Sequence, residues 1–143
     1  MSGYKKFVSC LFFFILFLCY ASTVFPVETR KDCRVCGMWI DQYLHTRHVM
    51  LMADGTQIFF CSFTCAAKYL KMNKPPAKLL QVADYLTTDL VGAEDAFYLV
   101  GSDAPPVMSY TSIIAFADRE SAESFQDLHG GRIMTYAEVL DTY

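Results

Sequence analysis

Residues 48–72 read HVMLMADGTQIFFCSFTCAAKYLKM, and this stretch predicts two strands followed by a helix. Residues 48–53 alternate in side-chain character as a strand does, and Asp54-Gly55 is a strong hairpin-turn pair before a return strand over residues 56–60. Ser62 is a typical N-cap residue and predicts a helix over residues 63–72. The stretch therefore predicts a β-β-α unit.

The second half of the chain repeats this order. After predicted strands at 79–82 and 86–91, the remaining expected elements are strands at 96–100 and 111–116, a helix at 119–128 capped by Asp118, a strand at 132–135 and a helical turn at 136–140. At an offset of 56 residues, Phe60 aligns with Phe116 and Ser62 with Asp118. The halves resemble a duplicated unit, although the shared strand-to-helix pattern alone could produce a match of this length. The expected fold class is α+β.

The N-terminus has the pattern of an export signal. Lys5 and Lys6 precede an uncharged apolar run from Phe7 to Phe25. Residues 1–27 are therefore predicted to be a signal peptide or a retained membrane anchor, with the rest of the chain crossing the membrane. Lipid attachment at Cys19 is the less favoured alternative, because Leu18 stands where the bacterial signal has a small residue. We expect a periplasmic or other extracytoplasmic protein that associates with the membrane through its N-terminus.

Length and charge narrow the possible functions. The chain has 143 residues and a net charge of −3, without a cluster of Lys and Arg. Nucleic-acid binding is not expected, because phosphate recognition needs clustered basic side chains. Removal of an export segment leaves room for one compact domain or two very small ones.

Four cysteines form the main candidate site. Cys33 and Cys36 make a C-x-x-C pair, and Cys61 and Cys65 make a C-x-x-x-C pair after a gap of 24 residues. This spacing is typical of a metal site, and the predicted hairpin between the pairs can bring the four sulfurs together. Cys61 and Cys65 are expected one helical turn apart. Structural disulfides and a redox-active C-x-x-C pair remain as alternatives.

Methionine and histidine side chains could complete the site. Thiolates with thioethers suit Cu(I), whereas four thiolates alone suit Zn²⁺. Met38, after the C-x-x-C turn, and Met108, after Pro105-Pro106, are candidate ligands, and His129 is a weaker one. Two further groups are expected to serve other roles: Met50 and Met52 in core packing, and His45 and His48 as solvated side chains.

Five motifs follow one another along the chain: Cys33-Arg-Val-Cys36-Gly37-Met38, Phe60-Cys61-Ser62-x-x-Cys65, Tyr98-Leu99-Val100-Gly101-Ser102-Asp103, Pro106-x-Met108 and His129-Gly130-Gly131. In this order they resemble the NosL family of copper-binding accessory factors for nitrous oxide reductase maturation. The second motif also resembles the TRASH metal-binding motif. The resemblance implies two small ββαβ units, assigned to residues 28–92 and 93–143, related to the organomercurial lyase fold. Met108 matches the family's Pro-x-Met position, although Ser109 follows where Gly is common.

The resemblance also implies a function. The expected protein is a non-enzymatic Cu(I) metallochaperone that works beside a copper-transport or copper-loading apparatus. It would deliver copper to a periplasmic cuproenzyme, for which the family suggests nitrous oxide reductase. The alternatives are a thiol-disulfide oxidoreductase, a carbon–mercury lyase, or a structural module that binds zinc. A lyase would need a poised carboxylate, and Asp32 and Asp41 are the acids near the first cysteine pair.

Overall fold

The computed structural model describes residues 31–143. The predicted signal or anchor segment and the alternative lipid site at Cys19 lie outside these residues. Among the described residues, every helix is too short or too polar to cross a membrane.

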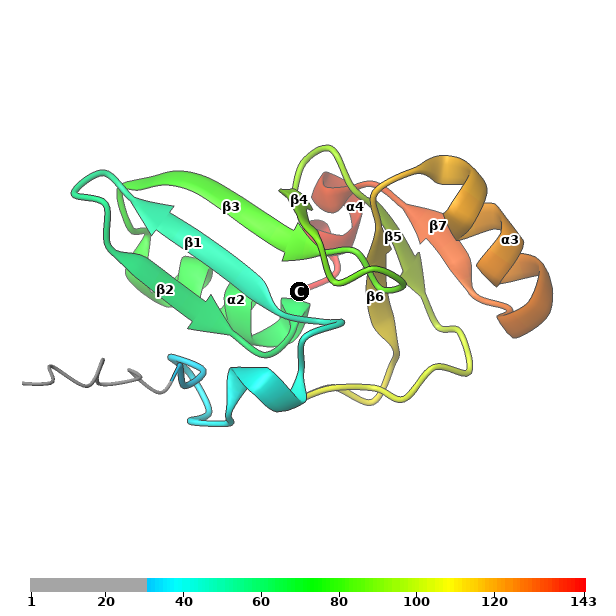
Figure 1. Cartoon of the computed structure of the whole chain (residues 1–143), viewed down its shortest axis with the longest axis horizontal. Helices are drawn as coiled ribbons and strands as arrows, with labels where there is room; N and C mark the ends of the chain where they lie inside the picture. The colour runs from blue at the N-terminus through cyan, green and yellow to red at the C-terminus, as the bar shows by residue number, and fades with distance from the viewer. Residues whose placement is uncertain (1–30) are drawn as a thin grey trace, which may run out of the picture.

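The first half builds a four-stranded antiparallel sheet with strand order β2-β1-β3-β4 (Figure 1). The predicted hairpin is present: β1 and β2 are joined by a turn in which Gly55 has a φ of 87°. One helix, α2, packs on this sheet (Figure 1). The elements are β1 (His48–Met52), β2 (Gln57–Phe60), α2 (Phe63–Asn73), β3 (Ala77–Ala83) and β4 (Leu90–Gly92), preceded by the short 3-10 helix η1 (Ile40–Gln42).

Local chemistry sets the ends of α2. The Ser62 hydroxyl accepts a hydrogen bond from the Cys65 backbone N–H and so satisfies one free donor of the first turn. At the other end, Lys74 adopts a left-handed conformation, and Pro75 and Pro76 follow it. Because proline cannot continue a helix, the chain leaves for β3.

The second half repeats the order of the first with a three-stranded sheet, β6-β5-β7. The positions of β5, β6 and β7 correspond to those of β1, β2 and β3, so the predicted duplication is confirmed in the topology. The elements are β5 (Phe97–Val100), β6 (Ile113–Phe116), α3 (Arg119–His129), β7 (Arg132–Met134) and α4 (Tyr136–Asp141).

Aligned residues play matching roles in the two units. Phe60 packs on Tyr69 with ring centroids 5.2 Å apart and an interplanar angle of 50°. In the aligned pair, Phe116 and Phe125, the ring centroids are 5.4 Å apart and the interplanar angle is 48°. Asp118 caps α3 as Ser62 caps α2. The offset of 56 residues therefore relates equivalent positions in three dimensions.

Two local predictions were wrong. The strand predicted over 86–91 is shortened to β4, because the Asp84 carboxylate accepts hydrogen bonds from the N–H groups of Leu86 and Thr87 and holds a turn there. His48, which was expected in solvent, is only 2% exposed. It lies on β1, which has a neighbouring strand on each side and packing on both faces, so its ring is enclosed.

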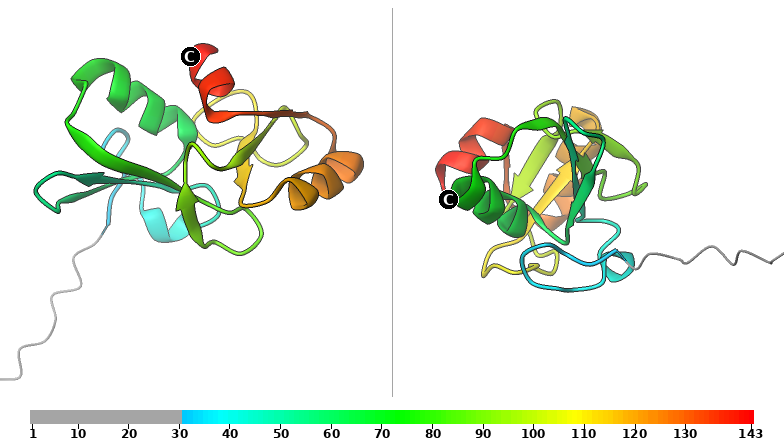
Figure 2. Two further views of the ribbon diagram at one scale, coloured as in Figure 1. Left: turned by 90° about the horizontal axis from the view of Figure 1, so that it is seen from above. Right: turned by 90° about the vertical axis from the view of Figure 1, so that its left-hand side faces the viewer.

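The two units share a core. Phe63 at the start of α2 packs edge-on against Tyr98, Tyr136 and Tyr143 of the second unit. This contact places α4 beside α2, as both views of Figure 2 show. The buried members of this core are Phe63, Ala67, Val82, Ala93, Ala96, Tyr98, Ala115, Met134 and Val139.

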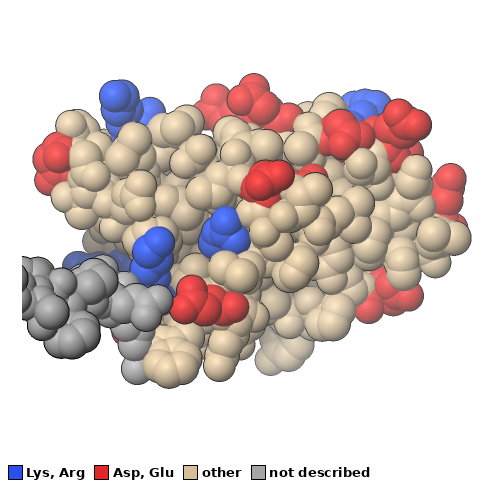
Figure 3. Space-filling view, in the orientation of Figure 1, with Lys and Arg blue, Asp and Glu red and all other residues tan. Residues whose placement is uncertain are grey.

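Charge is distributed unequally along the molecule. Residues 31–92 contain seven Lys and Arg against five Asp and Glu, whereas residues 93–143 contain two against nine. In Figure 3 acidic side chains predominate at the end of the molecule that carries α3. Such an asymmetry orients a molecule as it approaches a charged surface or partner.

Candidate metal centre

The first cysteine pair lies in a closed turn. The Cys33 backbone N–H donates to the Met38 carbonyl oxygen, and the Gly37 N–H donates to the Cys33 carbonyl oxygen, both at 2.8 Å. Gly37 has a φ of 75°, which glycine adopts without strain. An isolated β-bridge between Asp32 and Trp39 closes the base of the turn. These backbone contacts therefore hold the C-x-x-C loop in a closed conformation.

One backbone hydrogen bond attaches this loop to the hairpin. The Arg34 N–H donates to the Phe59 carbonyl oxygen on β2 at 2.8 Å. Phe59 lies two residues before Cys61, so the bond brings the first pair beside the second. The prediction that the hairpin returns the chain to its start is confirmed.

The second pair spans the junction of β2 and α2. Cys65 is in the first turn of α2, but Cys61 precedes the N-cap Ser62 and is not helical. The two residues were expected one helical turn apart, and Cys61 instead lies just before the helix begins. The sulfurs are still close, because the extended cap residue turns the chain back: the Cys61 and Cys65 Sγ atoms are 3.7 Å apart.

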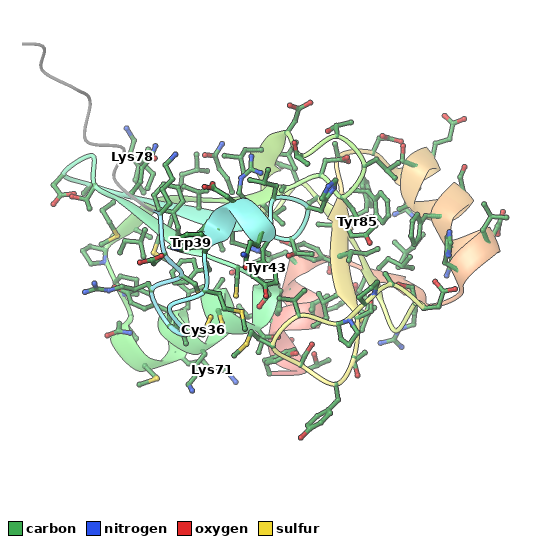
Figure 4. All side chains as sticks on the ribbon, turned by 60° about the horizontal axis from the view of Figure 1, so that its bottom comes forward. Cys36, Trp39, Tyr43, Lys71, Lys78 and Tyr85 are labelled. Atoms are coloured by element: carbon green, nitrogen blue, oxygen red, sulfur yellow. The ribbon has the colours of Figure 1, made fainter. Side chains whose placement is uncertain are left out.

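The four Sγ atoms form one cluster, all lying within 4.8 Å of one another. The Cys36 and Cys61 Sγ atoms, one from each pair, are 3.4 Å apart. Cys33, Cys61 and Cys65 are at most 3% exposed, whereas Cys36 is only partly buried. Figure 4 shows Cys36 on the same face as Trp39 and Tyr43. All four are free thiols, so the cluster offers four sulfur donors with one partly open to solvent.

Three cysteines of the cluster have pKa values shifted in different directions. The pKa of Cys65 is lowered to about 6, chiefly by the hydrogen bond that its sulfur accepts from the Cys61 thiol, against the opposing effect of burial. Thiolate at this position is also favoured by the N-terminus of α2. The pKa of Cys61 is raised because it donates to Cys65 and is buried, and burial also raises the pKa of Cys36. The cluster thus favours ionisation at Cys65, beside thiols that would lose their protons when a cation binds.

The two candidate methionines have different relations to the cluster. Met38 packs against the buried core that contains all four cysteines. Met108 is 43% exposed and lines an open groove of about 550 Å³ that also reaches Thr64, the neighbour of Cys65. Val107, beside Met108, packs against the cysteine core. Met50, by contrast, is fully buried, as expected of a core residue.

His129 is not part of the cysteine cluster. It ends α3, which lies at the opposite end of the molecule from α2 (Figure 1). Its Nδ1 atom is 2.8 Å from an Asp103 carboxylate oxygen, and its ring stacks on Phe125 at 4.0 Å. Its backbone carbonyl also accepts the Asp103 N–H at 3.0 Å. The motifs that carry Asp103 and His129 are therefore joined to each other.

Two residues near the site carried no recognisable signal in the sequence. Thr64 donates to or accepts from the Tyr143 hydroxyl at 2.9 Å, which ties the start of α2 to the end of α4. Val107 reaches the cysteine core from the second unit. Both contacts join residues far apart in the chain, so no local pattern could have identified them.

Known proteins resemble this chain in sequence and fold. The profile of the NosL family matches residues 24–143. The copper-binding lipoprotein NosL of Stutzerimonas stutzeri is 24% identical over 120 residues, which cover 76% of this chain and 61% of that protein. The chain thus corresponds to less than two thirds of that relative's length.

Two solved structures are also similar. The copper chaperone NosL from Shewanella denitrificans superposes with a TM-score of 0.67 at 21% identity, covering 80% of this chain and 92% of that one. The apo-NosL protein from Achromobacter cycloclastes gives a TM-score of 0.47 at 22% identity over 64% of this chain and 82% of that one. The first match establishes the same fold. With a family profile that spans both units, the chain belongs to the NosL family.

Proposed function

We propose that this chain binds Cu(I) through Cys33, Cys36, Cys61 and Cys65 outside the cytoplasm and passes the ion to another protein, as a carrier and not as an enzyme. The observation that carries the proposal is the cluster of four sulfur atoms within 4.8 Å of one another. Thiolates are soft ligands that favour Cu(I). The partly buried Cys36 gives the ion a route in and out of a site that is otherwise enclosed.

Family membership supports copper as the metal. A curated relative is named a copper-binding lipoprotein, and a protein of the same fold is named a copper chaperone. The acids beside the cluster do not favour a lyase, since Asp32 and Asp41 are exposed and neither belongs to the buried sulfur cluster.

The proposal includes the methionines in two roles. Met38, which packs against the cysteine core, is a candidate ligand at the edge of the site. Met108, on the groove beside Thr64, is a candidate for the exchangeable ligand that a departing ion would use. A neutral thioether binds Cu(I) without adding charge, which suits release. His129 as a ligand stays a prediction, and Asp103 is its present partner.

A zinc site is the second candidate, because four thiolates within 4.8 Å of one another also suit tetrahedral Zn²⁺ with Zn–S distances of about 2.3 Å. Competition distinguishes the two metals. The reduced full-length chain is loaded with Zn²⁺ and then titrated with Cu(I) buffered by a Cu(I)-specific chelator. We expect Cu(I) to displace Zn²⁺. Retention of Zn²⁺ at a free Cu(I) concentration set by the chelator would contradict the carrier function.

A pair of variants tests the ligand set. Cys61→Ser with Cys65→Ser should greatly weaken Cu(I) binding, because it removes two of the four sulfurs. Ser121→Ala is the matched control, since Ser121 occupies the position in the second unit that aligns with Cys65. It should bind copper as the parent chain does. Equal binding by all three proteins would remove the second cysteine pair from the site.

The proposed recipient is an exported copper enzyme, with nitrous oxide reductase as the first to examine. A cell that lacks the chain should accumulate that enzyme with reduced copper content. Restoring the parent chain should correct the defect, and restoring Cys36→Ser should not. A normal copper content in the deficient cell would exclude this recipient.

A further inference from the structure

We infer that oxidation joins Cys36 to Cys61 in a disulfide between the two cysteine pairs, which closes the copper site. The cross-link itself depends only on the geometry of the thiols. Its consequence for copper rests on the proposed function above.

The positions of the sulfurs favour this pairing. The Cys36 and Cys61 Sγ atoms are 3.4 Å apart, whereas those of Cys61 and Cys65 are 3.7 Å apart. A disulfide bond is about 2.05 Å long, so the sulfurs of Cys36 and Cys61 need to approach each other by only about 1.4 Å. The hydrogen bond from Arg34 to Phe59 already holds the C-x-x-C loop against β2.

Access to solvent favours the same pairing. An external oxidant must first reach a thiol, and Cys36 is the partly buried member of the described cluster, while the other three are buried. The first bond to the oxidant therefore forms at Cys36. Cys61, from the other pair, has its sulfur 3.4 Å from that of Cys36 and is positioned to react with it.

The reaction balances with a disulfide as the oxidant, either of low molecular weight or in a protein. The Cys36 thiol gives up its proton and its sulfur attacks the oxidant's disulfide, and one oxidant sulfur leaves and takes up that proton. The Cys61 sulfur then attacks Cys36 Sγ, and the second oxidant sulfur leaves with the second proton. Two electrons pass from the two cysteines to the oxidant, which becomes two thiols.

The oxidised chain would lack two of its four sulfur ligands. Cys33 and Cys65 alone would remain as thiols, so Cu(I) binding should be lost until a reductant restores the site. Extracytoplasmic compartments are oxidising, which makes the state relevant there. Bound Cu(I) would engage Cys36 and Cys61 and so protect them from the oxidant.

Peptide mapping tests the pairing in the full-length chain. Cleavage after Lys and Arg places Cys33 in residues 32–34, Cys36 in 35–47, and Cys61 with Cys65 in 48–68, while Cys10 and Cys19 fall in 7–30. After treatment with oxidised glutathione and blocking of free thiols, we expect a linked peptide of 35–47 with 48–68. A link from 32–34 to 35–47, or one within 48–68, would overturn the inference and leave the proposed copper function unaffected.

Single variants assign the partner. Cys65→Ser should still give the linked peptide, which places the bond at Cys61, and Cys33→Ser should also give it. Cys36→Ser should give none. A link that survives in Cys61→Ser but disappears in Cys65→Ser would assign the bond to Cys65 and overturn the inference.

Copper retention separates this inference from the function on which it depends. The reduced chain is expected to hold Cu(I) against a chelator, the oxidised chain to lose it, and a reductant to restore it. If a chain that is fully linked between Cys36 and Cys61 retains Cu(I) as well as the reduced chain does, the inference that the disulfide closes the copper site is wrong. Failure of the reduced chain to bind Cu(I), with the linked peptide still present, would instead refute the proposed function.

Discussion

At the residue scale, Met108 combines exposure with an unusual backbone. It is 43% exposed and has a φ of 58°, a conformation that non-glycine residues adopt rarely. Met108→Leu keeps the size and apolarity of the side chain, so thermal stability should stay that of the parent. Cu(I) affinity or the rate of transfer to a recipient should fall, because the thioether is lost.

Met72→Leu is the matched control, since Met72 is an exposed methionine at the other end of α2 from the cysteines. It should alter neither copper binding nor transfer. If Met108→Leu behaves in the same way, Met108 is not a ligand, and its match to the family's Pro-x-Met motif has no role in metal binding here.

Glycine positions give a second test at this scale. Gly131 has a φ of 96°, and a Cβ atom there would lie 2.9 Å from the Ser102 nitrogen and 3.0 Å from the Val100 oxygen. Gly37 has a φ of 75° with no atom within 4 Å of such a Cβ. Left-handed backbone costs an alanine about 1–2 kcal/mol. Urea unfolding should therefore show that Gly37→Ala lowers the free energy of unfolding by about that amount and that Gly131→Ala lowers it by more. Equal losses in the two variants would mean that the loop at Ser102 moves freely.

At the element scale, the N-caps of α2 and α3 are equivalent in structure but not in surroundings. Ser62→Ala and Asp118→Ala should each lower the free energy of unfolding by about 1 kcal/mol, because each removes the acceptor for a first-turn N–H. Only Ser62→Ala should also weaken Cu(I) binding, since Ser62 separates Cys61 from Cys65 and orients the first turn of α2. Equal copper affinity in both variants would show that the sulfurs keep their places without the cap.

The two duplicated units differ in the residues at their strand-to-helix junctions. Both units use a strand, a capped turn and a helix packed through an aromatic pair. In the first unit the junction carries Cys61 and Cys65, and the aligned positions in the second carry Ala117 and Ser121. The same element therefore serves as a candidate metal site in one copy and as a structural support in the other.

At the scale of the whole molecule, His48 makes stability depend on pH. Its ring lies against Phe63 and Tyr98, where the two units meet. Nδ1 lies 3.1 Å from the Thr46 carbonyl oxygen and so donates to it, and Nε2 is buried without a hydrogen-bond partner. Burial lowers the pKa of His48 from 6.5 to about 4, and Tyr98, the titratable group facing it, has a raised pKa and stays neutral.

The sign of the effect follows from these values. Below pH 6.5 the unfolded chain takes up a proton at His48 and the folded chain does not, so stability falls as the pH is lowered toward 4. The contribution reaches about 3 kcal/mol at most. The free energy of unfolding, measured with urea, should differ less between pH 7.5 and pH 4.5 in His48→Gln than in the parent. His45→Gln, at an exposed position, should keep the parent's difference. An undiminished difference in His48→Gln would assign the pH dependence to other groups.

Much of the fold follows from local patterns in the sequence. The hairpin turn at Asp54-Gly55, the caps at Ser62 and Asp118 and the end of the second helix at Gly130-Gly131 depend on residues within a few positions of each other, and all are present. The turn after Asp84 was missed because its carboxylate competes with the strand for the same N–H groups. Periodicity does not reveal that competition.

The sequence by itself determined the α+β class, the duplicated order of elements and the soft sulfur donors of the candidate four-cysteine site, because each depends on residue type and short spacing. Only the tertiary structure decided which sulfurs touch, since Cys36 meets Cys61 through a bond from the loop to β2. It likewise decided that His48 is enclosed and that His129 pairs with Asp103. These contacts join positions far apart in the chain, and their formation depends on the packing of whole units, to which neighbouring residues contribute no local signal.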